Sequence, residues 1–263
     1  TINNTTFAPE KITNQYEEIV HGGMIGIAHG STITNCSSDV DVNVVSFCSA
    51  EKSIKSAVGA MIGGAAAGCT FSNLINNGNV VYSGITQKGN IYMSGVIGKA
   101  NTTEGDFGIV SINYCTNNGT LSSTKESVVG GSLMMSGITG DILPGREVTS
   151  SFLENNGTIT YSGNTLEAYS QYMAGVAAVM NNIAEGAVNN GEIKVIDGVQ
   201  YTKLQMAGVF GNISGLGSSQ KYTSCVNNGT ISYSATNNED GLKELYIGGI
   251  TVISNAHGYD SGN

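Results

Sequence analysis

The tripeptide Asn-Asn-Gly occurs five times in this chain at a nearly constant spacing. The copies begin at Asn76, Asn117, Asn155, Asn189 and Asn227, which lie 41, 38, 34 and 38 residues apart. A regular period of this size indicates a stacked repeat architecture, in which each unit buries its apolar face against the next unit. The pattern therefore favours a function carried by a long uniform surface over one carried by a single pocket.

The tripeptide belongs to a longer phrase: a small or apolar residue, any residue, Asn, Asn, Gly, a polar residue and an aliphatic one. A degenerate first copy, residues 36–42, has Ser38-Asp39-Val40 in place of Asn-Asn-Gly. A second phrase, centred on glycine as in residues 93–98, alternates with the first. About seven copies of the second phrase and six of the first predict about seven repeats of 33–42 residues.

The segments between these glycines and asparagines have the composition of strands. They are short and rich in Val, Ile, Thr and Tyr, and residues 158–162 and 230–234 alternate polar with apolar side chains. The chain has 37 glycines, and only 12% of its residues are charged, against about 25% in ordinary domains. We therefore predict an all-β, parallel β-solenoid, right-handed because parallel crossovers almost always are, forming a single repeat domain over residues 1–263.

Two arrangements of the coil are compatible with the repeat. One three-sided coil per repeat stacks each phrase on its own copy, whereas two coils of about 19 residues per repeat remain the alternative. Residues 1–20 could form an N-terminal cap or lead-in, with a helix over Pro9–Val20. Because the chain starts at Thr1 and stops after a second-type phrase, we expect a segment of a longer protein.

Asparagine and glycine both tolerate left-handed backbone angles, and stacked asparagine amides can hydrogen-bond along the stack. Asn-Asn-Gly therefore predicts a structural corner with a ladder of side chains along the axis. The predicted ladder residues are Asn76, Asn117, Asn155, Asn189 and Asn227, with Gly78, Gly119, Gly157, Gly191 and Gly229.

Other residue types also recur in columns. In the second phrase, Ser94, Val96 and Gly98 are expected to point inward. Four methionines share the opposite face of these strands, either as corner packing or as an exposed stripe for a partner chain: Met93, Met135, Met173 and Met206.

Two tyrosine columns are either ordinary strand residues or a ridge that binds sugar or protein: Tyr92, Tyr172 and Tyr246, and Tyr82, Tyr161 and Tyr233.

Cysteines indicate core positions rather than disulfides. Cys36, Cys115 and Cys225 occupy a repeat position that is elsewhere leucine or alanine. Two coils separate Cys36 from Cys115, or about 10 Å at the strand spacing, which is too far for a disulfide. We expect these thiols to be free, while Cys48 and Cys69 could still pair.

Charge and motif content exclude several classes of function. The formal net charge is −9 with a single arginine, Arg146, which argues against a nucleic-acid partner and against binding to anionic lipid. The apolar stretch 57–69 is too short to cross a membrane, so we expect no membrane insertion. The three histidines show no metal spacing, and no phosphate loop occurs, so we expect no cofactor and no metal site.

Carboxylates are the candidates for enzymatic chemistry, because polysaccharide-cleaving β-helices use clustered acids. Asp39 with Asp41, and Glu239 with Asp240, are the pairs to consider, but no constellation converges, and we predict no catalytic residue. Several Asn-x-Ser/Thr sites could carry glycans if the protein is secreted by a eukaryote: Asn101, Asn118, Asn156, Asn212 and Asn228.

The two phrases together resemble the GLUG-type repeats of bacterial surface proteins. Gly248-Gly249-Ile250, residues 95–98, and Cys115 and Cys225 with their following Asn-Asn-Gly carry the resemblance. It implies a β-solenoid stalk or adhesin. We expect a non-enzymatic, extracellular or cell-surface structural or adhesive segment, which could belong to a fibre and associate with itself, with neighbouring surface proteins or with a cell-surface glycan. The alternative is a glycan-binding or polysaccharide-cleaving β-helix.

Overall fold

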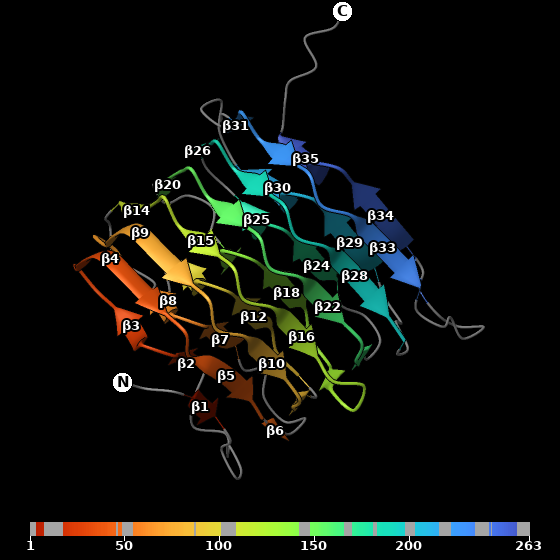
Figure 1. Cartoon of the computed structure of the whole chain (residues 1–263). Helices are drawn as coiled ribbons and strands as arrows, with labels where there is room; N and C mark the ends of the chain where they lie inside the picture. The colour runs from red at the N-terminus through yellow and green to blue at the C-terminus, as the bar shows by residue number, and fades with distance from the viewer. Residues whose placement is uncertain are drawn as a thin grey trace, which may run out of the picture.

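The structure, a computed structural model, is a stack of parallel strands. It describes residues 4–7, 18–45, 47–48, 55–86, 88–100, 109–141, 148–165, 170–180, 183–197, 203–215, 222–234, 242 and 244–256. Five sheets run along the stack, and all of their described strand pairings are parallel. Figure 1 shows the chain advancing from coil to coil, from the red N-terminal strands to the blue C-terminal ones. The predicted all-β parallel solenoid is therefore confirmed.

We name the sheets A to E. Sheet A contains β1 (Asn4–Phe7), β5 (Asp41–Val44), β10 (Val80–Tyr82), β16 (Leu121–Ser123), β22 (Ile159–Tyr161), β28 (Ile193–Ile196) and β33 (Ile231–Ser234). Sheet B contains β6 (Phe47–Cys48), β11 (Ile85–Thr86), β17 (Val128–Val129) and β23 (Asn164–Thr165). Sheet C contains β2 (Glu18–Gly22), β7 (Lys55–Gly59), β12 (Ile91–Ser94), β18 (Leu133–Ser136), β24 (Gln171–Ala174), β29 (Lys203–Ala207) and β34 (Glu244–Gly248).

Sheet D contains β3 (Ile25–Ala28), β8 (Ile62–Ala65), β13 (Ile97–Ala100), β19 (Thr139–Asp141), β25 (Ala177–Met180), β30 (Phe210–Gly215) and β35 (Thr251–Ala256). Sheet E contains β4 (Thr32–Ser38), β9 (Thr70–Asn76), β14 (Val110–Asn113), β15 (Thr116–Asn117), β20 (Val148–Ser151), β21 (Glu154–Asn155), β26 (Ile183–Glu185), β27 (Val188–Asn189), β31 (Tyr222–Thr223) and β32 (Val226–Asn227).

Each repeat forms one coil. Asn76 pairs with Asn117, which pairs with Asn155, so every Asn-Asn-Gly lies directly on its own copy. This register confirms the one-coil arrangement and excludes two coils per repeat. The expectation of three sides was wrong: the strands form five sheets, so the coil has five sides. One of the additional corners is the turn at Gly95 and Val96, which splits the second phrase into β12 and β13 in two different sheets.

Sheets C and D fold back on each other as a wedge. A Cβ added to Gly59 would clash with the backbone oxygen of Ile62, across the turn between β7 and β8. A Cβ added to Gly95, at the turn between β12 and β13, would clash with the side chain of Asn117. The tip of the wedge therefore touches the asparagine corner between sheets E and A.

The wedge divides the interior into two apolar cores. The first lies between sheets D and E and includes Phe71, Ile97 and Ile112; the second lies between sheets A and C and includes Leu121 and Met93. All four methionines of the second phrase are buried in this second core. Their packing role is confirmed, and an exposed methionine stripe was wrong.

The left-handed backbone corner is not at Asn-Asn-Gly. Positive φ occurs instead one residue before the small or apolar residue that opens the phrase, as at Asn73 (φ 56°), Tyr114 (φ 51°) and Phe152 (φ 54°). Glycine is needed in Asn-Asn-Gly for another reason: a Cβ on Gly157 would clash with the backbone oxygen of Gly119 in the neighbouring coil. Close approach between coils, rather than torsion, selects glycine there.

The expected helix over Pro9–Val20 falls mostly outside the described residues. Its last three residues belong to strand β2, where Ile19 pairs with Ser56 and Val20 with Ala57. That end of the helix prediction was wrong, because backbone pairing with the next coil overrides the local helical pattern. Of residues 1–20, the structure also describes β1, which extends sheet A by pairing with β5.

Four thiols are free in the described structure: Cys36, Cys69, Cys115 and Cys225. The expectation for Cys36, Cys115 and Cys225 is confirmed, and the pairing of Cys69 with Cys48 was wrong. Burial raises the pKa of the Cys115 thiol to about 12, which keeps it protonated and unreactive.

The glycine corner leads to a direct test. Gly157→Ala places a methyl group against the backbone of the neighbouring coil, and we expect a loss of roughly 3 kcal/mol in the free energy of unfolding. Gly26→Ala in β3 is the control, because nothing lies within 4 Å of its added Cβ. Urea denaturation measures both, and equal midpoints for the two variants would refute close approach as the reason for glycine.

Candidate functional site

A buried column of asparagines runs through the centre of the molecule. The Nδ2 of Asn76 donates to the Oδ1 of Asn117 at 2.8 Å, and the same 2.8 Å bond recurs from Asn117 to Asn155, from Asn155 to Asn189 and from Asn189 to Asn227. Each Nδ2 also donates to the glycine carbonyl two residues on, as from Asn155 to Gly157 at 2.9 Å. We call these five residues the inner column. Its side chains lie between the two apolar cores, where an unpaired amide would be costly.

An exposed column runs beside it, in the opposite direction. Asn118 Nδ2 donates back to Asn77 Oδ1 at 2.9 Å, Asn156 donates to Asn118, Asn190 to Asn156 and Asn228 to Asn190. In the inner column the donors point toward the C-terminal end, and in this outer column they point toward the N-terminal end. The sequence predicted the inner column alone, and this outer column is an addition to it.

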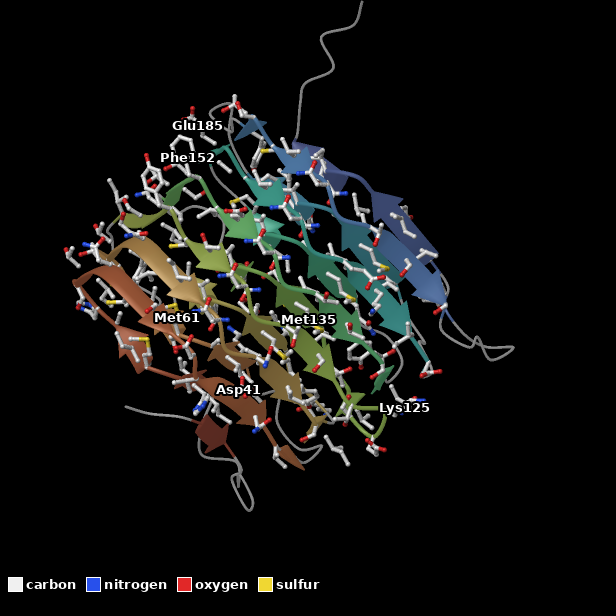
Figure 2. The ribbon with its side chains drawn as sticks, viewed as in Figure 1. Asp41, Met61, Lys125, Met135, Phe152 and Glu185 are labelled. Atoms are coloured by element: carbon white, nitrogen blue, oxygen red, sulfur yellow. The ribbon has the colours of Figure 1, made fainter. Side chains whose placement is uncertain are left out.

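Asp39 ends the outer column. Its carboxylate accepts from Asn77 Nδ2 at 2.8 Å. Asp41 ends a third column in the same way: it accepts from the backbone N of Asn79 at 2.7 Å, and Asn79 accepts from Thr120 Oγ1 at 2.7 Å. Figure 2 shows Asp41 near the N-terminal end of the stack, on the strand next to β1. Both acids act as terminal acceptors, and charge-assisted bonds of this kind are stronger than neutral ones.

The sites that could be glycosylated fall in different environments. Asn118, Asn156 and Asn228 are exposed members of the outer column, and their Nδ2 atoms already donate to the neighbouring coil. Asn212 is half-buried in β30, and Asn101 lies outside the described residues. An N-linked glycan would attach through the same Nδ2 atoms that hold the column together, and glycosylation stays a prediction.

Two charged side chains are buried together in the wedge. Lys99 and Asp141 are only 3% and 5% exposed, on the paired strands β13 and β19. The Lys99 Nζ lies 5.3 Å from the centre of the Tyr92 ring, a cation–π contact. Burial raises the pKa of Asp141 to about 6, although Lys99 and Lys55 act in the opposite direction. This cluster could not be predicted from the sequence, since neither residue belongs to a motif.

The predicted tyrosine ridge does not form on the surface. Tyr82 and Tyr161 are fully buried in the second core, where Tyr82 Oη lies 2.9 Å from Thr86 Oγ1 and Tyr161 donates to the Asn164 carbonyl at 2.8 Å. Tyr92 is buried in the wedge. Tyr172 and Tyr233 are half-buried, and Tyr246 is 40% exposed, so the two columns present one exposed tyrosine rather than a ridge. Tyr82 and Tyr161 point into the second core because side chains alternate along the strands of sheet A. Tyr92 is buried because both faces of β12 are covered.

Two exposed aromatics that the sequence reading missed stack on each other. Tyr114 and Phe152 are 55% and 47% exposed, and their rings stack with centroids 4.8 Å apart and planes 12° apart. They occupy the column of positive φ, which holds Asn35, Asn73 and Ser224 in other coils. They could have been recognised in the sequence as two bulky aromatics at a repeat position that is polar in other coils.

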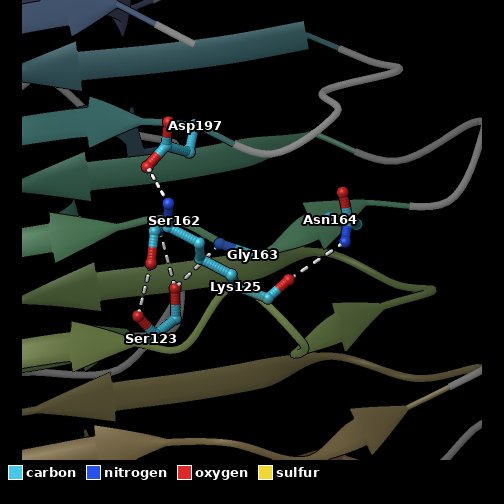
Figure 3. Close-up of polar contacts among 6 residues, drawn as sticks. All are labelled: Ser123, Lys125, Ser162, Gly163, Asn164 and Asp197. Atoms are coloured by element: carbon cyan, nitrogen blue, oxygen red, sulfur yellow. Dashed lines mark hydrogen bonds and ion pairs between the residues drawn. The ribbon is translucent and has the colours of Figure 1, made fainter. Parts of the chain in front are cut away.

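The corner after sheet A is held by polar contacts between coils (Figure 3). Ser162 donates its backbone N to Ser123 Oγ at 2.8 Å, and Asn164 Nδ2 donates to the Lys125 carbonyl at 3.2 Å. Lys125 Nζ also reaches Asp197 at 2.9 Å, two coils further along. Both partners of this ion pair are at least half exposed, so it contributes little to stability.

Other chemistry is limited in the part of the chain that the structure describes. There, no group of three His, Cys, Asp or Glu residues is arranged to hold a metal ion. Within the same ranges, no helix is long and apolar enough to span a membrane. Arg146, Glu239 and Asp240 lie outside the described residues.

The inner column predicts that substituting two adjacent asparagines by alanine changes the free energy of unfolding by very different amounts. Asn155→Ala removes the acceptor of the Asn117 Nδ2 hydrogen bond. It also removes the donor to the Gly157 carbonyl and to Asn189 Oδ1. At about 1–3 kcal/mol for each buried unpaired group, we expect a loss of roughly 3 kcal/mol or more. Asn156→Ala is the matched control, because water can replace its exposed bonds, and we expect a change of about 0.5 kcal/mol. Chemical denaturation measures the free energy of unfolding of both variants. Similar losses would show that the buried amide bonds of the inner column do not dominate stability.

Asp141 predicts a pH dependence of stability. Because its folded pKa is raised, the folded state retains a proton between about pH 4 and pH 6 that the unfolded state has lost. This contribution is complete below pH 4 and is lost as the pH rises through 6. Across this range we expect wild type to lose about 3 kcal/mol relative to Asp141→Asn. Thermal unfolding of both proteins from pH 4 to pH 7 measures the difference, and parallel curves would contradict it.

Comparisons with family models, with curated proteins and with solved structures find no match for this chain.

Proposed function

We propose that this chain is a non-enzymatic structural or adhesive segment of an extracellular or cell-surface protein. One observation carries the proposal: polar side chains at equivalent positions bond to each other from coil to coil instead of converging on one point. The inner column, the outer column and the Asp41–Asn79–Thr120 column all have this form. Such an arrangement supports a stiff stack with a continuous lateral surface.

The disposition of the acids also favours this function over polysaccharide cleavage. Asp39 and Asp41 accept hydrogen bonds from two different columns, and Asp141 lies buried beside Lys99. A glycosidase needs two carboxyl groups facing one bond of the substrate. The resemblance to GLUG-type repeats supports a place on a microbial surface, with a neighbouring protein or a cell-surface glycan as the partner.

Adhesion can be tested with the full chain coated on beads. We expect the beads to bind cells or extracellular matrix, and beads coated with heat-denatured chain to lose binding, because adhesion requires the assembled lateral surface. Antibody labelling of intact source cells tests the surface location. Failure of the folded chain to bind any surface, together with labelling only after cell lysis, would refute the proposal.

Catalysis is tested separately. The chain is incubated with a panel of neutral and acidic polysaccharides, and the release of reducing ends is measured. We expect no release above a denatured control. Cleavage of any member of the panel would establish the enzymatic alternative.

A further inference from the structure

Tyr114 and Phe152 are an exception within their column. The same corner position holds Asn35, Asn73, Gly186 and Ser224 in other coils. Asparagine and glycine adopt positive φ readily, whereas bulky residues there are strained. Two successive coils therefore carry aromatic residues where the backbone disfavours them.

Stability does not explain this choice. The two rings stack on each other, and the Phe152 ring also leans over Gly186, where an added Cβ would lie 2.9 Å from its Cδ1. These contacts recover only part of what burial would provide, because about half of each side chain remains exposed. Strained, exposed residues of this kind are typical of ligand-binding positions.

Polar groups flank the aromatic pair on both sides. On one side, Ser111 Oγ lies 3.1 Å from Thr149 Oγ1, and Ser151 Oγ donates to Asn113 Oδ1 at 2.8 Å. These hydroxyl and amide groups retain further donor or acceptor capacity beyond the bonds they make. They repeat along the axis at the strand spacing of about 4.8 Å.

Carboxylates complete the surroundings. On the other side of the pair, Glu154 Oε1 accepts from Asn190 Nδ2 at 3.0 Å. Glu185 is exposed beside Phe152, whose backbone N donates to the Glu185 carbonyl at 2.7 Å, and Figure 2 shows the two residues at the same edge. Such a surface repels anions and accepts hydrogen bonds from hydroxyl groups.

We propose that the Tyr114–Phe152 pair and its polar flanks bind a neutral glycan chain. A sugar presents apolar C–H groups together with hydroxyls, and the surface offers an apolar centre between hydrogen-bonding sides. The two carboxylates select against sulfated and uronic-acid glycans. The inference rests on the adhesive function proposed above and assigns it a site.

The test replaces both aromatics with the residue that the column uses elsewhere. Tyr114→Asn with Phe152→Asn should relieve the backbone strain, so we expect the melting temperature to stay constant or rise. Binding to an array of immobilised neutral polysaccharides should fall at least tenfold. Ile85→Thr is the matched control, since Ile85 is an exposed apolar residue in sheet B, and it should leave both readouts unchanged.

Each outcome is decisive. The inference is overturned if wild type binds no neutral polysaccharide, if it prefers sulfated or uronic-acid chains, or if the double variant binds as wild type does. A fall in the melting temperature of the double variant would also overturn it, by showing that the rings hold the corner. If the double variant still adheres to cells, the adhesive function stands and only this site fails, whereas wild type that adheres to nothing refutes the function itself.

Discussion

The buried amide chain of the inner column is the constraint on which the other parts of the structure depend. It lies between two apolar cores and touches the tip of the wedge formed by sheets C and D. An amide at this depth must be paired, so the five coils from Asn76 to Asn227 each bring an asparagine to the same height and the same angle, and the first coil ends the series with Ser38. This requirement sets the register of all the sheets, because a slip in any coil would leave two amides unpaired.

Packing in the remainder of the coil follows from that register. Since each asparagine lies on the next, the adjoining glycines approach each other closely, and a side chain at Gly157 would strike the coil beside it. The turn at Gly95 has to fit against Asn117 for the same reason. Leucine, cysteine and alanine replace one another at the position that opens the Asn-Asn-Gly phrase, because the first core requires only an apolar group there.

The sequence was a good guide wherever a residue meets its own copy. The parallel stack, the single coil per repeat, the free thiols and the inner column all follow from the recurrence of like residues. It was a poor guide to what lies across the coil. The direction of the Tyr82 side chain and the positions of the corners depend on contacts between different segments of the coil. These segments share no repeated sequence from which the contacts could be predicted. The five-sided coil, the position of positive φ and the wedge were therefore not predictable from the period.

For the candidate site, the same distinction holds. Asp39 and Asp41 stood out in the sequence as a break in the repeat, but only the structure identifies them as acceptors at the ends of two columns. Lys99 and Asp141 lie close together because β13 pairs with β19. No motif in the sequence around either residue predicts this contact. Tyr114 and Phe152 were hidden because their column is defined by backbone torsion rather than by residue type.

The opposite directions of the inner and outer columns have a consequence for the growth of such a molecule over evolutionary time. Each added coil contributes one amide dipole pointing toward the C-terminal end and one pointing toward the N-terminal end, so the two side-chain contributions largely cancel. A single column would accumulate a dipole with every duplication of the repeat, as an α-helix does with every turn. With two opposed columns, duplication or loss of a repeat changes the length of the molecule without building up charge at its ends.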